Sequence, residues 1–103
     1  MLKDNLTTKE FDAFVAGPGV VLVDLYATWC GPCKMQGKVL EEMAAENPEL
    51  KIGKVNVDDE AELAVRYQVS AIPALLIFKD GRLMRNFVGL QSKQTLLDAI
   101  SNA

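Results

Sequence analysis

The sequence predicts an α/β domain in which a mixed central β-sheet is flanked on both faces by helices. Short apolar runs rich in β-branched residues alternate along the 103-residue chain with segments whose apolar residues recur at helical spacing. Such strand–helix–strand units place strands in one sheet with helices packed on it. Asp80-Gly81 lies between the last two apolar runs and is a strong type I′ hairpin signal, so at least two strands are antiparallel. No repeat or linker interrupts the pattern, and we expect residues 1–103 to form a single domain.

Capping signals and apolar patterns in the first half of the chain define a helix, a strand and a second helix. Thr7-Thr8-Lys9-Glu10 is a capping box, and the helix that it begins ends at Gly17-Pro18-Gly19. Residues 20–26 are apolar on both faces except at Asp24, a pattern typical of a central strand covered on both sides. A second helical pattern follows Cys30-Gly31-Pro32-Cys33 and stops before the next proline.

The second half of the chain predicts three more strands and two more helices. We expect the strands over residues 52–57, 74–78 and 83–88. Asp58 or Asp59 is placed to cap a short helix that runs through Tyr67, and Gly89 ends the last strand. Ser92 can cap the final helix. The apolar face of that helix consists of Leu96, Leu97 and Ile100.

Composition excludes several classes of site and partner. The chain has no histidine, which rules out Ser-His-Asp triads, Cys-His dyads and imidazole metal ligands. Its two cysteines are too few for a disulfide scaffold or for a four-ligand zinc site within one chain, and we expect no metal. The net charge of −3 is opposite to that of a typical nucleic-acid-binding domain. Residues 1–9 lack the apolar stretch of a secretory signal, and no run approaches the roughly 20 apolar residues of a membrane span. We therefore expect a cytoplasmic protein that binds neither nucleic acid nor membrane.

Cys30 and Cys33 lie at the junction between the central strand and the second helix. Side chains at i and i+3 of a helix are about 5–6 Å apart at Cβ, so this pair can alternate between dithiol and disulfide without unfolding. Cys30 precedes the first turn, where unpaired amides and the helix dipole should lower its pKa and favour an exposed thiolate. Cys33 lies within the turn and should be more buried. Because Pro32 lacks an N–H, the Cys33 amide is the obvious donor to Cys30, and we expect a moderately lowered pKa and a reducing pair.

The pair has two other interpretations. It could be two incidental core cysteines, or half of a metal or iron–sulfur site shared between two chains. A lone C-x-x-C motif does not decide among these, but its position at a strand-to-helix junction, in a chain without other metal ligands, favours redox chemistry.

The segment Trp29-Cys30-Gly31-Pro32-Cys33-Lys34 is similar to the active-site motif of the thioredoxin family, and the resemblance extends over essentially the whole chain. The other matching segments are Val23-Asp24, Lys54-Val55-Asn56-Val57-Asp58, Ile72-Pro73, Phe78-Lys79-Asp80-Gly81 and Val88-Gly89. The chain is therefore identified as a member of this family, which implies a single thioredoxin domain with the thioredoxin fold.

The resemblance implies a protein dithiol–disulfide oxidoreductase in which Cys30 is the nucleophile and Cys33 the resolving cysteine. Asp24 is the one polar residue of an apolar strand, and burial should raise its pKa so that it can act as a general base. The family assigns the matching aspartate to deprotonation of the resolving cysteine; the alternative is an aspartate turned to solvent. Lys54 matches the lysine that the family pairs with this aspartate, and is otherwise an ordinary solvated strand lysine.

The same resemblance places client-binding residues around the cysteines. These residues are Trp29, Gly31, Pro32, Ile72, Pro73 and Gly89. Pro73 matches the family's cis proline, whose neighbouring backbone offers hydrogen bonds to an extended client segment, whereas the sequence alone allows an ordinary trans peptide. Gly89 would leave room beside that segment or simply end a strand. Trp29 either contacts partners beside the thiolate or fills the end of the strand.

The resemblance also implies an electron donor and a set of partners. A thioredoxin reductase would reduce the oxidised pair with electrons from NADPH, with a ferredoxin-linked reductase as the alternative. The chain itself would bind no cofactor beyond its redox-active disulfide. Its partners would be disulfide-containing client proteins, for example reductases and peroxidases, and we expect a monomer. Two rival functions remain open: an oxidase or isomerase of an oxidising compartment, and a binding module that uses the surface between Trp29 and Pro73.

Overall fold

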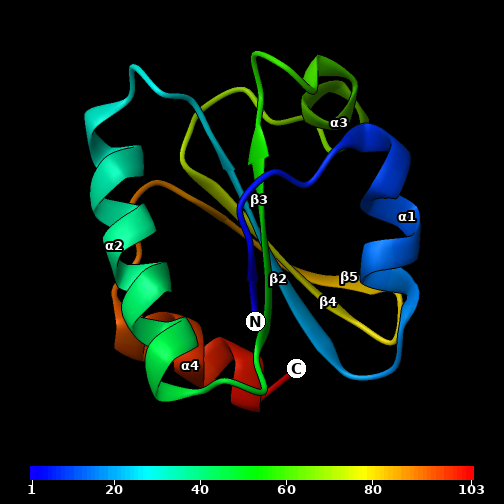
Figure 1. Cartoon of the computed structure of the whole chain (residues 1–103), viewed down its shortest axis with the longest axis vertical. Helices are drawn as coiled ribbons and strands as arrows, with labels where there is room; N and C mark the ends of the chain where they lie inside the picture. Colours follow the sequence, from blue (N-terminus) through cyan, green and yellow to red (C-terminus); the bar gives the residue numbers. More distant parts are fainter.

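The computed structural model describes all 103 residues and contains a five-stranded mixed sheet with helices on both faces (Figure 1). The strands are β1 (Leu2–Lys3), β2 (Val20–Tyr26), β3 (Lys51–Asn56), β4 (Ala74–Lys79) and β5 (Arg82–Val88). The helices are α1 (Thr8–Ala16), α2 (Gly31–Glu46), α3 (Ala61–Arg66) and α4 (Lys93–Ser101). The order in the sheet is β1-β3-β2-β4-β5, with β1, β3 and β2 parallel and β4 antiparallel to both of its neighbours. The predicted fold class is confirmed.

The central strand β2 divides the interior into two apolar cores. Helices α2 and α4 cover one face of the sheet, and α1 and α3 cover the other (Figure 1). The odd-numbered residues of β2 pack with Phe11 of α1, whereas Leu22 packs with Leu40 of α2 and Leu96 of α4. Since successive side chains of a strand point to opposite faces, Asp24 points to the same face as Leu22. The one acidic residue of β2 therefore lies on the side of the sheet that α2 covers.

Three local signals in the sequence produce the structure that they predict. Thr7 caps α1 in a reciprocal capping box with Glu10, and Ser92 caps α4 by accepting a hydrogen bond from the amide of Thr95. Asp80 and Gly81 have φ angles of 50° and 84°, the two positive values that a type I′ turn requires. Each signal involves residues at most three positions apart, so the local sequence is enough to specify the conformation.

One expectation for local structure is wrong, and one short strand was not predicted. Neither Asp58 nor Asp59 caps α3: its N-cap is Glu60, which forms no side-chain cap hydrogen bond. The backbone turn that leaves β3 uses these positions instead, because the Glu60 amide bonds to the carbonyl of Asn56 at 2.9 Å. The strand β1 was not predicted, because two residues are too few for an alternating apolar pattern. No helix of the structure has the length and apolarity needed to cross a bilayer.

Candidate active site

Cys30 is the N-cap of α2, and its own sulfur makes the cap. Its backbone is extended, with φ −95° and ψ 113°, and its Sγ accepts a hydrogen bond from the Cys33 amide at 3.2 Å. The structure records the two cysteines as a disulfide, with Cα atoms 5.2 Å apart. Pro32 lies in the first turn, where its missing N–H has no helical partner to lose. Both the cap and its donor match the sequence prediction. In the reduced pair, this amide and the positive end of the helix dipole favour a Cys30 thiolate.

The two sulfurs are less accessible than the sequence suggests. Cys30 is 7% exposed and Cys33 is 3% exposed, so their order is as expected, but the expectation of an openly exposed Cys30 is wrong for this disulfide form. The cysteines form a small apolar cluster with Ala27, and Ile72 packs against it. Cys30 Sγ lies 4.0 Å from the carbonyl oxygen of Ile72, a residue 42 positions away in the chain. Cys30 therefore presents only a small part of its surface to solvent, and that part is bordered by apolar residues.

Asp24 is fully buried, and neither of its carboxylate oxygens has a hydrogen-bond partner in the protein. Burial raises the pKa of this carboxyl to about 7, although the positive charge of Lys54 acts in the opposite direction. The alternative of an aspartate turned to solvent is excluded. A carboxyl with this pKa is about half ionised at neutral pH, so it can both accept and release a proton there.

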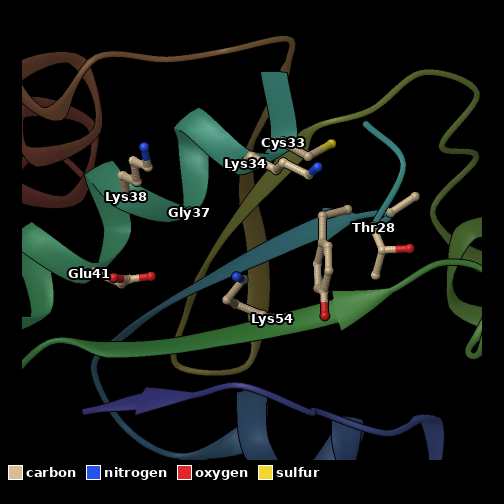
Figure 2. A pocket seen from close by; sticks show the side chains of 9 residues that line it. Thr28, Cys33, Lys34, Gly37, Lys38, Glu41 and Lys54 are labelled. Carbon is tan, nitrogen blue, oxygen red and sulfur yellow. The ribbon is translucent and has the colours of Figure 1, made fainter. Parts of the chain in front are cut away.

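Lys54 lies beside Asp24 on the neighbouring strand β3, in register with it. It makes no ion pair with the carboxylate: its ammonium lies over the Tyr26 ring, with Nζ 4.7 Å from the ring centroid. Lys54 influences Asp24 through its charge, which lowers the pKa of the carboxyl. Figure 2 shows its side chain in a pocket of about 330 Å³ between β3 and α2, which Cys33 also lines. The pocket thus connects the resolving cysteine with the charge that tunes Asp24.

Trp29 lies on the surface immediately before the nucleophile. Its side chain is 70% exposed, which excludes the alternative that it fills the end of the strand. The indole Nε1 donates a hydrogen bond to Oδ2 of Asp58 at 2.9 Å, so the ring is held in one orientation although it is solvated. Gly31 and Pro32, which follow in the motif, are also exposed. An exposed, oriented aromatic ring beside a reactive sulfur suits contact with a partner protein.

The Ile72–Pro73 peptide bond is cis, as the resemblance implied. Pro73 is buried, and its carbonyl accepts a hydrogen bond from the Gly89 amide at 2.8 Å, which joins the two loops. Gly89 has φ +91°, and a Cβ built on it would meet no atom within 4 Å. Within this chain the glycine is therefore required by its backbone conformation and not by crowding.

Two apolar residues beside this loop and one polar residue beneath it were not predicted from the sequence. Val88 is 62% exposed and Leu90 is 44% exposed, on either side of Gly89. A usable signal was present, since two apolar residues flank a glycine at the end of an edge strand. Gln36 of α2 is fully buried and bonds to the backbone of Gln91. Nothing in the local sequence indicates that contact. No group of three or more His, Cys, Asp or Glu side chains in the structure could hold a metal ion.

Comparison with known proteins gives consistent matches over the whole chain. The thioredoxin family model matches residues 3–102. The thioredoxin of Chlamydia pneumoniae is 46% identical over 96 residues, which is 93% of each chain. A solved mutant thioredoxin from Halobacterium salinarum superposes with a TM-score of 0.89 at 37% identity, over 98% of this chain and 88% of that chain. A yeast structure described in terms of thiol resolution in a mitochondrial 1-Cys peroxiredoxin, via glutathione and thioredoxin systems, gives a TM-score of 0.87 at 27% identity, over 99% and 95% of the two chains.

Proposed function

Because this chain belongs to the thioredoxin family and is a protein dithiol–disulfide oxidoreductase, we propose that it works as a reductase of client-protein disulfides. The observation that carries the proposal is the asymmetry of the pair. Cys30 caps α2 and receives the Cys33 amide, whereas Cys33 is the more buried sulfur and lines the pocket that Lys54 shares. One sulfur is thus activated for attack on an external disulfide, and the other is held in place to complete the exchange.

The first step is attack of the Cys30 thiolate on one sulfur of a client disulfide. The client S–S bond breaks, its second sulfur leaves as a thiolate that takes a proton from water, and a mixed disulfide joins Cys30 to the client. The Cys33 amide stabilises the attacking thiolate through the hydrogen bond to Sγ. A single neutral donor and no neighbouring histidine stabilise the Cys30 thiolate only moderately, which fits a reducing pair better than a strongly oxidising one.

The second step is attack of Cys33 on Cys30. Cys33 must first lose its proton, and Asp24 is placed on the α2 side of the sheet with a pKa of about 7, which suits it to take up that proton near neutral pH. The new Cys30–Cys33 bond forms as the Cys30–client bond breaks, and the client leaves with its second thiol. Two electrons have then passed from the pair to the client. Because Cys30 caps the helix that contains Cys33 and their Cα atoms are 5.2 Å apart, the closing reaction is intramolecular and has a high effective concentration.

Client binding is assigned to the apolar surface around the sulfurs. The surface consists of Trp29, Gly31, Pro32, Ile72 and Gly89, extended by Val88 and Leu90, and the buried Pro73 contributes only the backbone beside it. An extended client segment can pair with the backbone beside Pro73 in the manner of an added strand, while its apolar side chains cover the exposed residues. This arrangement selects clients by the exposure of their disulfide and not by a deep pocket.

The partners and compartment form the finer part of the proposal. We assign re-reduction of the Cys30–Cys33 disulfide to a thioredoxin reductase that uses NADPH. We place the protein in the cytoplasm, where a reducing environment keeps the pair in its dithiol form. We expect it to act there as a monomer. Peroxidases and reductases that form disulfides in turnover are the proposed clients. The similarity to the yeast structure concerned with peroxiredoxin resolution supports the peroxidase class.

Trapping tests the proposal directly. Cys33→Ser should still attack clients and remain bound to them through Cys30, so tagged protein isolated under alkylating conditions should carry adducts that a thiol reductant releases. The matched control is Cys30→Ser, which should carry none. Adducts on Cys30→Ser but not on Cys33→Ser would reverse the assigned roles. A biological effect that survives replacement of both cysteines by serine would favour the binding module instead.

A further inference from the structure

Gln36 is one of two buried polar side chains in the protein, the other being Asp24, and its hydrogen bonds go to Gln91 and not to either cysteine. It lies on α2, three residues after Cys33, and it is completely buried. Its Nε2 donates to the carbonyl oxygen of Gln91 at 3.1 Å, and its Oε1 accepts from the Gln91 amide at 2.7 Å. Both polar atoms of one side chain are therefore paired with the backbone of one residue that lies 55 positions away in the chain.

This two-point contact fixes both partners. The amide can take only one orientation, because a flipped side chain would place its donor against the Gln91 N–H and its acceptor against the Gln91 carbonyl. A buried side-chain amide without hydrogen-bond partners would destabilise the folded protein, so Gln36 keeps its contact with Gln91 as long as the surrounding segments are folded. Gln36 thus joins the helix that carries both cysteines to the segment between β5 and α4.

The contact continues into the client-binding surface. The side chain of Gln91 turns back, and its Nε2 donates to the carbonyl of Gly89 at 3.2 Å and, at the longer distance of 3.5 Å, to that of Val88. The amide of Gly89 in turn donates to the carbonyl of Pro73. A continuous set of hydrogen bonds therefore runs from α2 through residues 88–91, here named the docking loop, to the loop of the cis proline.

We propose that Gln36 is a positioning residue that sets the docking loop relative to Cys30 and so determines how well the protein binds client proteins. Val88 is 62% exposed and Leu90 is 44% exposed, so apolar packing does little to hold the loop. Polar bonds from beneath must do so. The inference rests on the proposed function, because it takes the docking loop to be part of the client-binding surface.

The test is a single-turnover reaction between the chemically reduced protein and excess insulin, a protein that carries disulfides. The sole tryptophan, Trp29, reports oxidation of the adjacent pair by its fluorescence. Gln36→Leu removes both hydrogen bonds at similar side-chain volume, and a loop that must be ordered on binding weakens the complex. We expect the insulin concentration at half-maximal rate to rise about three- to tenfold, with a limiting rate changed less than twofold. Gln36→Leu should change the rate of reaction with a small aromatic disulfide by a smaller factor than it changes the half-saturation concentration for insulin, because the small disulfide does not need residues 88–91.

Two further variants separate positioning from a general loss of stability. Val39 lies three residues after Gln36 on the same helix and packs against the core between α2 and the sheet. Val39→Ala removes apolar volume there and should lower the melting temperature without raising the half-saturation concentration. Gln36→Glu keeps the acceptor for the Gln91 amide and loses the donor to its carbonyl. Protonation of the new carboxylate restores a donor, so the ratio of half-saturation concentrations, variant to wild type, should fall toward one between pH 8 and pH 5.5.

The outcomes distinguish the inference from the function on which it rests. If the wild type does not reduce insulin, the proposed reductase function fails. If the wild type does and Gln36→Leu shows an unchanged half-saturation concentration, the positioning role is wrong and Gln36 only stabilises the fold. A rise of the same size in Val39→Ala would also overturn it.

Discussion

Replacing Asp24 with asparagine should stabilise the protein at neutral pH and slow its catalytic cycle. The carboxyl is buried without a hydrogen-bond partner, and its folded pKa is about 7 against an ordinary value of 3.8. A group whose folded pKa is raised contributes stability that is fully present below the unfolded pKa and is lost as pH rises through the folded pKa. The loss therefore develops between about pH 4 and pH 7 and stays constant above that range.

The raised pKa of Asp24 determines how much stability the wild type loses at neutral pH. About three pKa units at about 1.4 kcal/mol each correspond to a loss on the order of 4 kcal/mol at and above neutral pH. Asparagine avoids the ionisation but buries an amide that also lacks partners, which costs about 1–3 kcal/mol. The net gain above pH 7 is then about 1–3 kcal/mol. At about 4–8 °C per kcal/mol, the melting temperature should rise by roughly 5–20 °C, and the advantage should disappear or reverse below about pH 4.

The assay is a set of melting curves from pH 3 to pH 9 for the wild type, for Asp24→Asn and for Glu41→Gln. Glu41 is an exposed carboxylate that lines the pocket shared by Cys33 and Lys54, so its variant controls for loss of a negative charge. Insulin reduction is followed in parallel, and Asp24→Asn should accumulate the mixed disulfide because the base for Cys33 is gone. A stability difference that is the same at every pH, or unchanged release of the client, would refute the reasoning.

Three other substitutions test separate parts of the site. Lys54→Met removes the charge that lowers the pKa of Asp24, so the carboxyl should titrate at higher pH in a carbon-detected NMR titration, and a pKa that stays or falls would contradict this assignment. Gly89→Ala should lower the melting temperature by about 4–15 °C, because φ +91° costs an L residue about 1–2 kcal/mol. The control is Gly17→Ala, at a position with φ −67° that is equally uncrowded, and it should lower the melting temperature far less. Asp58→Ala releases the Trp29 indole and should shift its fluorescence and weaken insulin binding, whereas Asp59→Ala, which has no bond to the indole, should do neither.

The features of the site that the sequence predicts are those encoded within a few residues. The cap at Cys30 depends on an amide three positions away, and the turn at Asp80-Gly81 depends on two adjacent backbone conformations. In both cases the local pattern and the tertiary structure favour the same conformation. The burial of Asp24 is different, because the pattern of its strand left open whether the carboxyl is buried or turned to solvent. The resemblance to the thioredoxin family favoured the buried position that the structure shows.

The features that the sequence does not predict depend on contacts between distant segments. Ile72 covers Cys30 from 42 positions away, so the exposure of the nucleophile cannot be inferred from the motif. The predicted cap of α3 failed because the turn after β3 closes through its backbone. Lys54 illustrates an intermediate case: its strand and its neighbour Asp24 were predicted, but the path of its flexible side chain over Tyr26 was not.

Asp24 and Gln36 are the two buried polar side chains, and they differ in whether their polar atoms have hydrogen-bond partners. Gln36 has both polar atoms paired, so burial turns it into a rigid connection between α2 and the docking loop. Asp24 has neither oxygen paired, so burial acts on its ionisation and places its pKa where a proton can be exchanged at neutral pH. Neutral replacements should therefore have opposite effects on stability at pH 7: Asp24→Asn raises the melting temperature and Gln36→Leu lowers it, because the second leaves the amide and carbonyl of Gln91 without their partner. Changes of the same sign in the two variants would mean that one of the two side chains has been assigned the wrong role.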